Sequence, residues 1–345
     1  MILSYSPQGK HPASLPAATT GKEKRSLPCI ADVISFLQQA IEPAAGGWLK
    51  PVAGFARRIP AFSGTILEVH VDKREDNIDF AARINADFDE GMMAGVKWQE
   101  YEIPFIPPLV AQLFEREGSS FAHGIENIWM EYDAPFNDQP AVFFDINRNK
   151  AFDPQAVYTC LRQVAGASSY HLSASLLPFL ERVQRAGLYV IYYGLMFSRG
   201  AQALRLTING VTPENLADAL HSLGWKGKYR SLEKIQCMYA SKDQKLVVGV
   251  DFGNCLGSRI GIELANNNEL AFIETLHSNG YINMEHVALL KAWKQRFILP
   301  AGLGQALTEL HRRPVSDLFT RFNHVKFVLD ETGTVKLKLY LYFCF

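Results

Sequence analysis

The sequence lacks the features that would place it in several broad classes of protein. Its 345 residues carry 35 basic and 35 acidic side chains, so it has no basic surplus of the kind that nucleic-acid-binding proteins show. The five cysteines are scattered without a CxxC pair, which favours reduced thiols over a disulfide framework. No apolar run approaches the roughly 18 residues of a transmembrane helix, and none near the start is typical of a signal peptide. These absences predict a cytoplasmic protein that binds neither nucleic acid nor membrane.

Familiar catalytic and metal-binding motifs are also missing. The chain contains neither a G-x-S-x-G nucleophile elbow nor a GxxxxGK[ST] phosphate loop. HxH and HExxH are absent too, and His70, His123, His171 and His324 are too dispersed to indicate a metal site. The sequence therefore predicts no metal ligands, and a function has to be inferred from architecture.

Segments that alternate like strands occur in five pairs, joined by turns that contain Gly, Asn, Asp or Pro. The pairs are residues 65–72 with 78–85, 125–133 with 141–147, 188–198 with 203–209, 245–252 with 259–264, and 323–330 with 335–343. They recur about every 60 residues. Helical periodicity and capping signals predict helices between them, at residues 153–164, 173–185, 212–224, 270–277 and 283–297.

The two ends of the chain differ in composition. Residues 1–28 are rich in Pro, Ser, Thr, Gly and Lys, and we interpret them as a flexible N-terminal tail. Residues 29–345 contain the alternating pattern, and we interpret them as a single α/β domain of about five helix–hairpin units.

Most of the predicted strands have one apolar face and one polar face. In residues 335–343, odd positions are apolar, whereas the even positions carry Lys336, Lys338, Tyr340 and Tyr342. A doubly wound parallel sheet would need strands that are apolar on both faces. The pattern instead predicts an α+β fold of about ten antiparallel strands with the helices on one side.

The alternation of helices with antiparallel hairpins, together with Lys336-x-Lys338-x-Tyr340-x-Tyr342, resembles the ABBA barrel of aromatic prenyltransferases. In that family, ten antiparallel strands enclose a central chamber and the helices form an outer ring. The resemblance covers residues 30–345 in rhythm and implies that the sheet closes into such a barrel. The row of Lys and Tyr side chains would then line the chamber.

The resemblance also implies roles for individual residues. Family members hold an allylic diphosphate with strand cations, shield the allylic carbocation with tyrosines, and use a strand carboxylate as a base toward an indole or a phenol. The shielding tyrosines would be Tyr340 and Tyr342, and the base would be Glu131 in Trp129-x-Glu131-x-Asp133. The cations would be Arg205, Lys326, Lys336 and Lys338, with Arg83 and Arg259 as companions.

The implied reaction transfers a prenyl group from an allylic diphosphate to an aromatic small molecule or to a peptide side chain. Fixed cations would stabilise the leaving diphosphate, and aromatic faces would stabilise the carbocation. The DDxxD motif of magnesium-dependent isoprenyl synthases is absent; residues 87–90 come nearest, and we interpret them as a solvated acidic turn. Some members of the family need no metal, so no cofactor is required and Mg²⁺ is an optional addition.

Other functions remain open at this point. The row of Lys and Tyr side chains could be an ordinary exposed sheet face, and Glu131 could belong to a structural ion pair. The chain would then be a non-catalytic peptide- or ligand-binding accessory protein of a biosynthetic pathway, so the sequence does not decide whether it is an enzyme. Residues 247–254 look like the first phosphate loop of sugar kinases, but only about 95 residues follow, and a tight turn between strands explains them better.

Overall fold

The computed structural model of this chain describes residues 27–45, 48–71, 77–85, 125, 127–136, 138–145, 152–167, 171–199, 203–236, 245–265 and 269–345. Most of the predicted tail, residues 87–90 and His123 lie outside this set. Leu27 and Pro28, at the end of the predicted tail, are described. Pro28 is buried, and its carbonyl accepts a hydrogen bond of 3.2 Å from the backbone N–H of Ala61.

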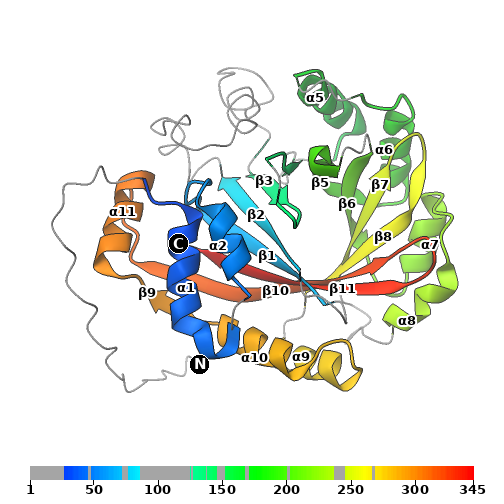
Figure 1. Cartoon of the computed structure of the whole chain (residues 1–345). Helices are drawn as coiled ribbons and strands as arrows, with labels where there is room; N and C mark the ends of the chain where they lie inside the picture. Colours follow the sequence, from blue (N-terminus) through cyan, green and yellow to red (C-terminus); the bar gives the residue numbers. More distant parts are fainter. Residues whose placement is uncertain are drawn as a thin grey trace, which may run out of the picture.

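Ten antiparallel strands form a closed barrel (Figure 1). They follow the order β11-β1-β2-β3-β4-β5-β6-β7-β8-β10, and β10 also pairs with β11, which closes the ring. Because the ring is closed, each of these ten strands pairs with a neighbour on both sides. The predicted α+β barrel is confirmed. The ten strands are β1 (Gly64–His70), β2 (Ile78–Asn85), β3 (Asn127–Tyr132), β4 (Ala141–Phe144), β5 (Tyr189–Leu195), β6 (Leu204–Val211), β7 (Leu246–Phe252), β8 (Leu256–Leu264), β10 (Asp317–Leu329) and β11 (Val335–Cys344).

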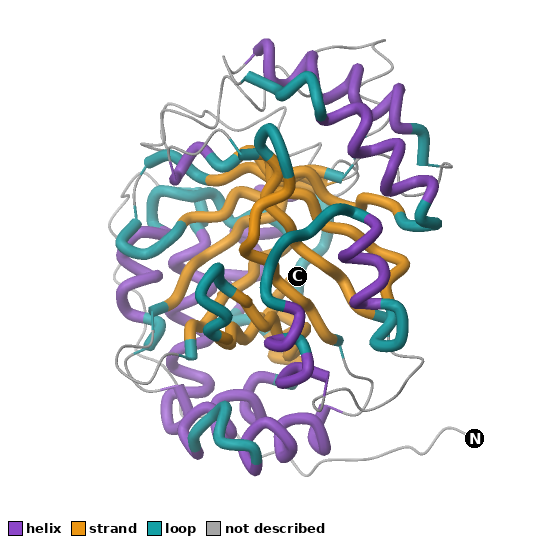
Figure 2. The backbone as a smooth tube through the Cα atoms, turned by 90° about the vertical axis from the view of Figure 1, so that its right-hand side faces the viewer, coloured by secondary structure: helices purple, strands orange, loops and turns teal. Residues whose placement is uncertain are grey.

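The helices lie around the outside of the barrel (Figure 2). They cover the apolar faces of the strands: Phe179 stacks against Phe252 of β7 with ring centroids 4.5 Å apart, and the indole of Trp293 donates a hydrogen bond of 3.1 Å to the carbonyl of Tyr342. The apolar half of each alternating strand therefore faces outward, and the polar half faces the interior. The helices are α1 (Ile30–Ala45), α2 (Lys50–Ala56), α5 (Pro154–Ala167), α6 (Leu176–Arg185), α7 (Leu216–Ser222), α8 (Glu233–Gln236), α9 (Glu269–Ser278), α10 (Met284–Trp293) and α11 (Ala301–His311), with 3-10 turns η2 (Phe197–Arg199) and η3 (Tyr229–Ser231).

The turn between β10 and β11 shows how local sequence fixes a hairpin. The carboxylate of Asp330 accepts hydrogen bonds of 2.9 Å from the backbone N–H groups of Thr332 and Thr334. Gly333 has a φ of 85°, a conformation that costs glycine little. This turn sets the register in which Lys326 lies opposite Lys338.

The segment after α10 differs from the prediction. Residues 283–297 were expected to form one helix, but α10 ends at Trp293 and Arg296–Ile298 form β9, an additional strand beside the first residues of β10. Thr320 accounts for this ending, because it accepts a hydrogen bond from the N–H of Gln295 and donates its own N–H to the carbonyl of Gln295. Tertiary pairing thus overrides the local helical pattern.

Other boundaries also shift. β10 begins at Asp317 rather than at residue 323, and α7 begins at Leu216 rather than at residue 212. The pattern did not predict α1, α2, α8 or α11. None of the helices in the described part of the chain is long and apolar enough to cross a membrane.

A bulge in β10 changes which side chains face the interior. The register with β11 shifts between Phe322 and His324. Because of this extra residue, Arg321 lies opposite Tyr342 and His324 lies opposite Tyr340, so both point inward although they are three positions apart.

Candidate active site

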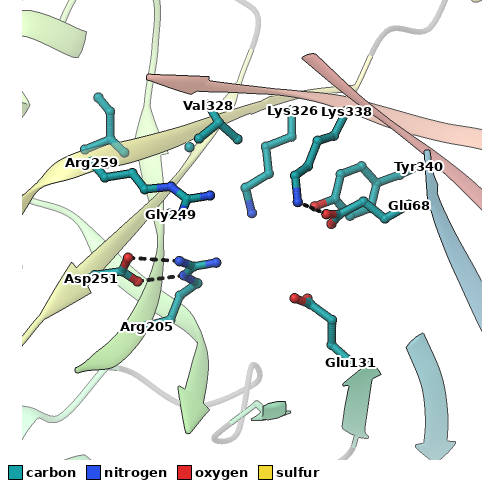
Figure 3. A pocket seen from close by; sticks show the side chains of 12 residues that line it. Glu68, Glu131, Arg205, Gly249, Asp251, Arg259, Lys326, Val328, Lys338 and Tyr340 are labelled. Atoms are coloured by element: carbon teal, nitrogen blue, oxygen red, sulfur yellow. Dashed lines mark hydrogen bonds and ion pairs between the residues drawn. The ribbon is translucent and has the colours of Figure 1, made fainter. Parts of the chain in front are cut away.

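The polar faces of the strands enclose a cavity inside the barrel (Figure 3). The space that atoms leave free there is about 370 Å³, counted with the adjoining solvent. Figure 3 shows Arg205, Arg259, Lys326 and Lys338 pointing toward a common space, with Glu131 across from them. The lining consists of Glu68, Glu131, Arg205, Gly249, Asp251, Arg259, Ile260, Gly261, Lys326, Val328, Lys338 and Tyr340.

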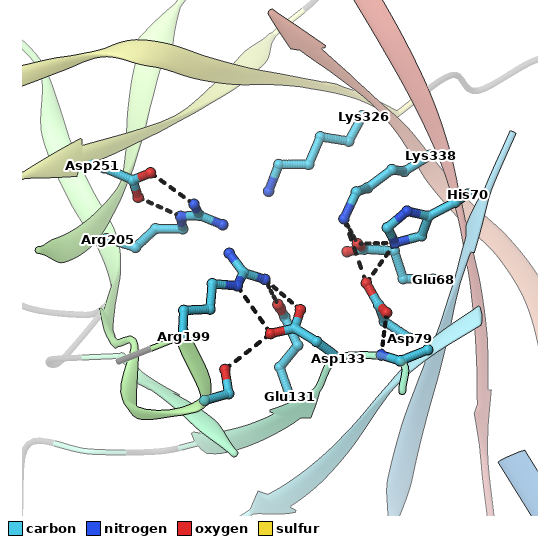
Figure 4. A network of polar contacts seen from close by, with 12 residues as sticks. Glu68, His70, Asp79, Glu131, Asp133, Arg199, Arg205, Asp251, Lys326 and Lys338 are labelled. Atoms are coloured by element: carbon cyan, nitrogen blue, oxygen red, sulfur yellow. Dashed lines mark hydrogen bonds and ion pairs between the residues drawn. The ribbon is translucent and has the colours of Figure 1, made fainter. Parts of the chain in front are cut away.

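One wall carries a buried cluster of four charged side chains (Figure 4). Lys338 forms an ion pair with Glu68 and lies 3.5 Å from Asp79, and His70 Nε2 lies 2.5 Å from Asp79. Glu68 and Asp79 are only 3% and 2% exposed. Burial alone would raise the pKa of Glu68, but the charge of Lys338, the hydrogen bond from His70 and the charge of Lys326 together outweigh burial and hold that pKa well below its usual value.

His70 is protonated within this cluster. Burial alone would lower its pKa, but the hydrogen bonds of its ring to Asp79 and Glu68 outweigh burial and raise the pKa to about 9. Two cations, His70 and Lys338, therefore face two carboxylates at neutral pH.

The same cluster is the one group of potential metal ligands found among the described residues. Ligand atoms of Glu68, His70 and Asp79 lie within 4.8 Å of one another. The sequence suggested no such site, because Asp79 is brought opposite Glu68 only by the pairing of β1 with β2. A divalent ion there would have to displace both the ammonium group of Lys338 and the proton of His70, so the residues fit a metal poorly.

A second group of ion pairs lies across the cavity. Arg199 Nη2 lies 2.8 Å from Glu131, and Arg199 Nε lies 2.9 Å from Asp133, which also accepts a hydrogen bond from Ser198. Burial and the negative charge of Glu68 raise the pKa of Glu131. Glu131 is therefore a carboxylate at the cavity with an increased affinity for a proton. No motif singled out Arg199, which lies in η2 between β5 and β6.

The cations on the remaining strands differ in how they are neutralised. Arg205 forms a bidentate ion pair with Asp251, in which Nε and Nη2 lie 2.7 and 2.9 Å from the two carboxylate oxygens. Lys326 Nζ lies 2.9 Å from Glu263 Oε1. Arg259 has no carboxylate partner among the described residues. Burial and the positive charges of Arg205 and Arg199 lower its pKa. An anion bound beside Arg259 would relieve this repulsion.

The two tyrosines of β11 have different surroundings. Tyr340 lines the cavity, stacks on His324 with ring centroids 4.1 Å apart, and has Lys326 Nζ 5.9 Å from its ring centre. Tyr342 lies beyond the lining, where the guanidinium groups of Arg83 and Arg321 lie 5.6 and 4.9 Å from its ring centre.

The structure brings most of the predicted site residues together. Lys336 and Tyr342 are the exceptions, because neither lines the cavity. Lys336 is exposed and lies opposite Val328, which does line it. The residues of the prediction that share the cavity are Glu131, Arg205, Arg259, Lys326, Lys338 and Tyr340.

Comparison with known proteins shows where this fold recurs. No family model matches the sequence, and no curated protein matches it significantly. Among solved structures, the apo form of the prenyltransferase PriB matches with a TM-score of 0.53 at 10% identity, covering 91% of this chain and 96% of that chain. PriB in complex with L-tryptophan and dimethylallyl thiolodiphosphate matches with a TM-score of 0.46 at 11% identity, over 91% and 96% of the two chains. AnaPT from Neosartorya fischeri matches with a TM-score of 0.45 at 12% identity, over 90% and 86%.

The match to the apo form of PriB concerns the whole architecture, since it spans nearly the full length of both chains. At such low identity the likeness establishes the fold and leaves the chemistry to the residues of this chain. The resemblance suggested by the order of hairpins and helices is confirmed at this level: the chain has the ABBA barrel fold of aromatic prenyltransferases.

Proposed function

We propose that the cavity binds an allylic diphosphate and transfers its prenyl group to an aromatic acceptor. The observation that carries this proposal is the unpaired Arg259, which shares the cavity with Arg205, Lys326 and Lys338. A bound diphosphate would supply the negatively charged partner that Arg259 lacks. The fold of the prenyltransferase PriB supports the same assignment by analogy.

The chemistry follows from the charges around the cavity. The bond between the allylic carbon and the diphosphate oxygen breaks, and its electron pair leaves with the diphosphate, which the cations stabilise. The ring of Tyr340 shields the allylic carbocation. A carbon of the acceptor ring then bonds to the allylic carbon, and the proton that this ring carbon loses passes to Glu131, whose raised pKa suits a base.

Two predicted residues take peripheral roles in this proposal. Lys336 lies exposed beside the lining residue Val328, where its charge would attract an incoming diphosphate. Tyr342 lies one inward-facing position beyond Tyr340, where it would close off the carbocation from the far end of the cavity. The acceptor, a small molecule or a peptide side chain, approaches from the side of Glu131.

Binding of a non-reactive donor tests the proposal directly. We expect dimethylallyl thiolodiphosphate to raise the melting temperature by several degrees, because a ligand that binds only the folded state stabilises it by about 2.7 kcal/mol at a hundredfold excess over Kd. Replacing Arg259→Gln should weaken this binding roughly tenfold to a hundredfold, as expected for losing a charged hydrogen bond. Isothermal titration calorimetry measures both.

The matched control is Arg185→Gln, which removes an exposed arginine from the last turn of α6 on the outer ring. It should bind the analogue as the native protein does. A native protein that shows no thermal shift with millimolar analogue would contradict the proposal and favour the non-catalytic peptide- or ligand-binding function.

A further inference from the structure

A second group of cations, half-buried Arg83 and exposed Arg321, lies beyond the cavity. Arg83 of β2 and Arg321 of β10 both lie over the ring of Tyr342, with their guanidinium carbons 5.6 and 4.9 Å from its centre. Arg83 also lies 5.7 Å from the ring centre of Trp129. Two guanidinium groups are thus held on aromatic faces within one small region.

Neither arginine is neutralised. Among the described residues, no carboxylate forms an ion pair with Arg83 or Arg321, and the buried Nε of Arg83 has no hydrogen-bond partner. By contrast, Arg205, which lines the cavity, and Arg199, whose partner Glu131 lines it, each have carboxylate partners. A guanidinium group that stacks on a ring keeps its N–H groups in its own plane, where they remain available to a planar oxyanion.

Two features of the strands place these arginines there. The bulge of β10 turns Arg321 inward, opposite Tyr342. On β1, Gly64 leaves the room that Arg83 occupies, since a Cβ at this position would lie 2.8 Å from Arg83 Nε and 2.9 Å from the hydroxyl of Tyr342. Bulges and strand glycines of this kind often mark sites where a side chain is aimed at a ligand.

We infer that Arg83 and Arg321 bind a carboxylate group carried by the aromatic acceptor. Tyr342 lies two positions beyond Tyr340 on β11, and Trp129 lies two positions from Glu131 on β3, so both walls continue from the cavity to the arginines by about 7 Å. An aromatic acid with a short chain spans this distance, with its ring beside Glu131 and its carboxylate at the arginines. The inference rests on the proposed function for the position of the ring.

The test compares an acid with its neutral isostere. We expect the native protein to bind indole-3-propionate at least tenfold more tightly than indole-3-propionamide in isothermal titration calorimetry, as expected for charged hydrogen bonds. In the double variant Arg83→Gln/Arg321→Gln this preference should disappear. The control Arg185→Gln/Arg230→Gln, which removes two exposed arginines outside the barrel, should keep it.

A thermal shift with dimethylallyl thiolodiphosphate separates this inference from the proposed function. The double variant should retain the native shift, which also shows that it is folded. Losing that shift together with the acid preference would assign the arginines to the diphosphate and overturn the inference. A native protein that binds acid and amide equally, binds neither, or binds inorganic phosphate more tightly than the acid would also overturn it. If dimethylallyl thiolodiphosphate does not raise the melting temperature of the native protein, only the proposed function is contradicted. The preference for the acid is measured without this donor analogue and is tested separately.

Discussion

Lys338 has both a structural and a proposed catalytic role. Its ammonium group faces the cavity, yet it also neutralises Glu68 and Asp79, which are almost fully buried. Removing one partner of a buried ion pair leaves an uncompensated charge, which is costly. A loss of activity on replacing Lys338 would therefore not by itself show a role in catalysis.

The variant Lys338→Met should be less stable than the native protein by about 3 kcal/mol, because the two carboxylates then retain only His70 as an ion-pair partner among the described residues. Urea unfolding measures this difference. Adding Glu68→Gln should restore a large part of it, since one of the uncompensated charges is removed. As a control, Lys291→Met on the exposed side of α10 should stay within about 0.5 kcal/mol of the native protein. Equal stability of Lys338→Met and native protein would show that the cluster contributes nothing.

His70 should make stability depend on pH. Its pKa is raised from 6.5 to about 9 in the folded state, despite the opposing effect of burial, because its ring hydrogen bonds to Asp79 and Glu68. The folded protein therefore holds this proton more tightly, and the resulting stabilisation is complete below about pH 6.5 and is lost as the pH rises through about 9. We expect His70→Gln to lower the free energy of unfolding strongly at pH 6 and weakly at pH 10. An effect that grows with pH would contradict this assignment.

At the scale of elements, the neighbouring strands β7 and β8 make room for a lysine. Gly249 and Gly261 lie opposite each other on the inner faces of these strands, and the stem of Lys326 passes over both. A Cβ at Gly261 would overlap Cε of Lys326, whereas one at Gly249 would lie 3.6 Å from Nζ. The absence of side chains at Gly249 and Gly261 thus leaves the space that Lys326 occupies.

The variant Gly261→Ala should therefore displace Lys326 and weaken binding of dimethylallyl thiolodiphosphate by roughly tenfold, about 1.4 kcal/mol. Calorimetric titration checks this. Gly302→Ala is a useful comparison, because Gly302 lies in the first turn of α11 with nothing within 4 Å of an added Cβ. That change should leave binding unaltered and stabilise the protein by about 0.5–1 kcal/mol. Unchanged binding in Gly261→Ala would argue against a role for Lys326 in holding the donor.

The strands themselves could be predicted from the sequence, because alternation is a local property. The last strand begins at the predicted residue 335 and ends one residue beyond residue 343, and Lys338, Tyr340 and Tyr342 face the interior as the resemblance implied, whereas Lys336 is exposed. The pairing partners could not be predicted in this way. Glu68 meets Lys338 across 270 positions, and the bulge that turns Arg321 inward depends on the register between β10 and β11. Such contacts follow from the closed sheet and have no local signature.

At the scale of the whole molecule, β11 is the strand that closes the barrel. It pairs with β1 along Gly64–His70 on one side and with β10 on the other. Its outward face supplies Leu337, Leu339 and Phe343 to the packing beneath the helices. Without β11, both neighbouring strands would expose unpaired backbone groups and a strip of apolar surface.

A chain cut after Thr334 should therefore fail to form a cooperatively folded barrel. We expect it to lose the sharp thermal transition, to bind a hydrophobic dye, and to be cleaved rapidly by protease, since it lacks one strand of a continuous hydrogen-bonded ring. Supplying residues 335–345 as a separate peptide should restore part of the structure. A cut protein that unfolds with the native transition would show that closure is not required.

The pairing of β1 with β11 also bears on biosynthesis. A ribosome makes β1 hundreds of residues before β11, since Glu68 and its partner Lys338 are 270 positions apart. The nascent chain can form hairpins and cover them with helices, but its first strand has to wait for β11 before its open edge is paired. We therefore expect the barrel to close only after translation has passed β11. During that interval the cell must protect the exposed edge of β1 from pairing with other chains.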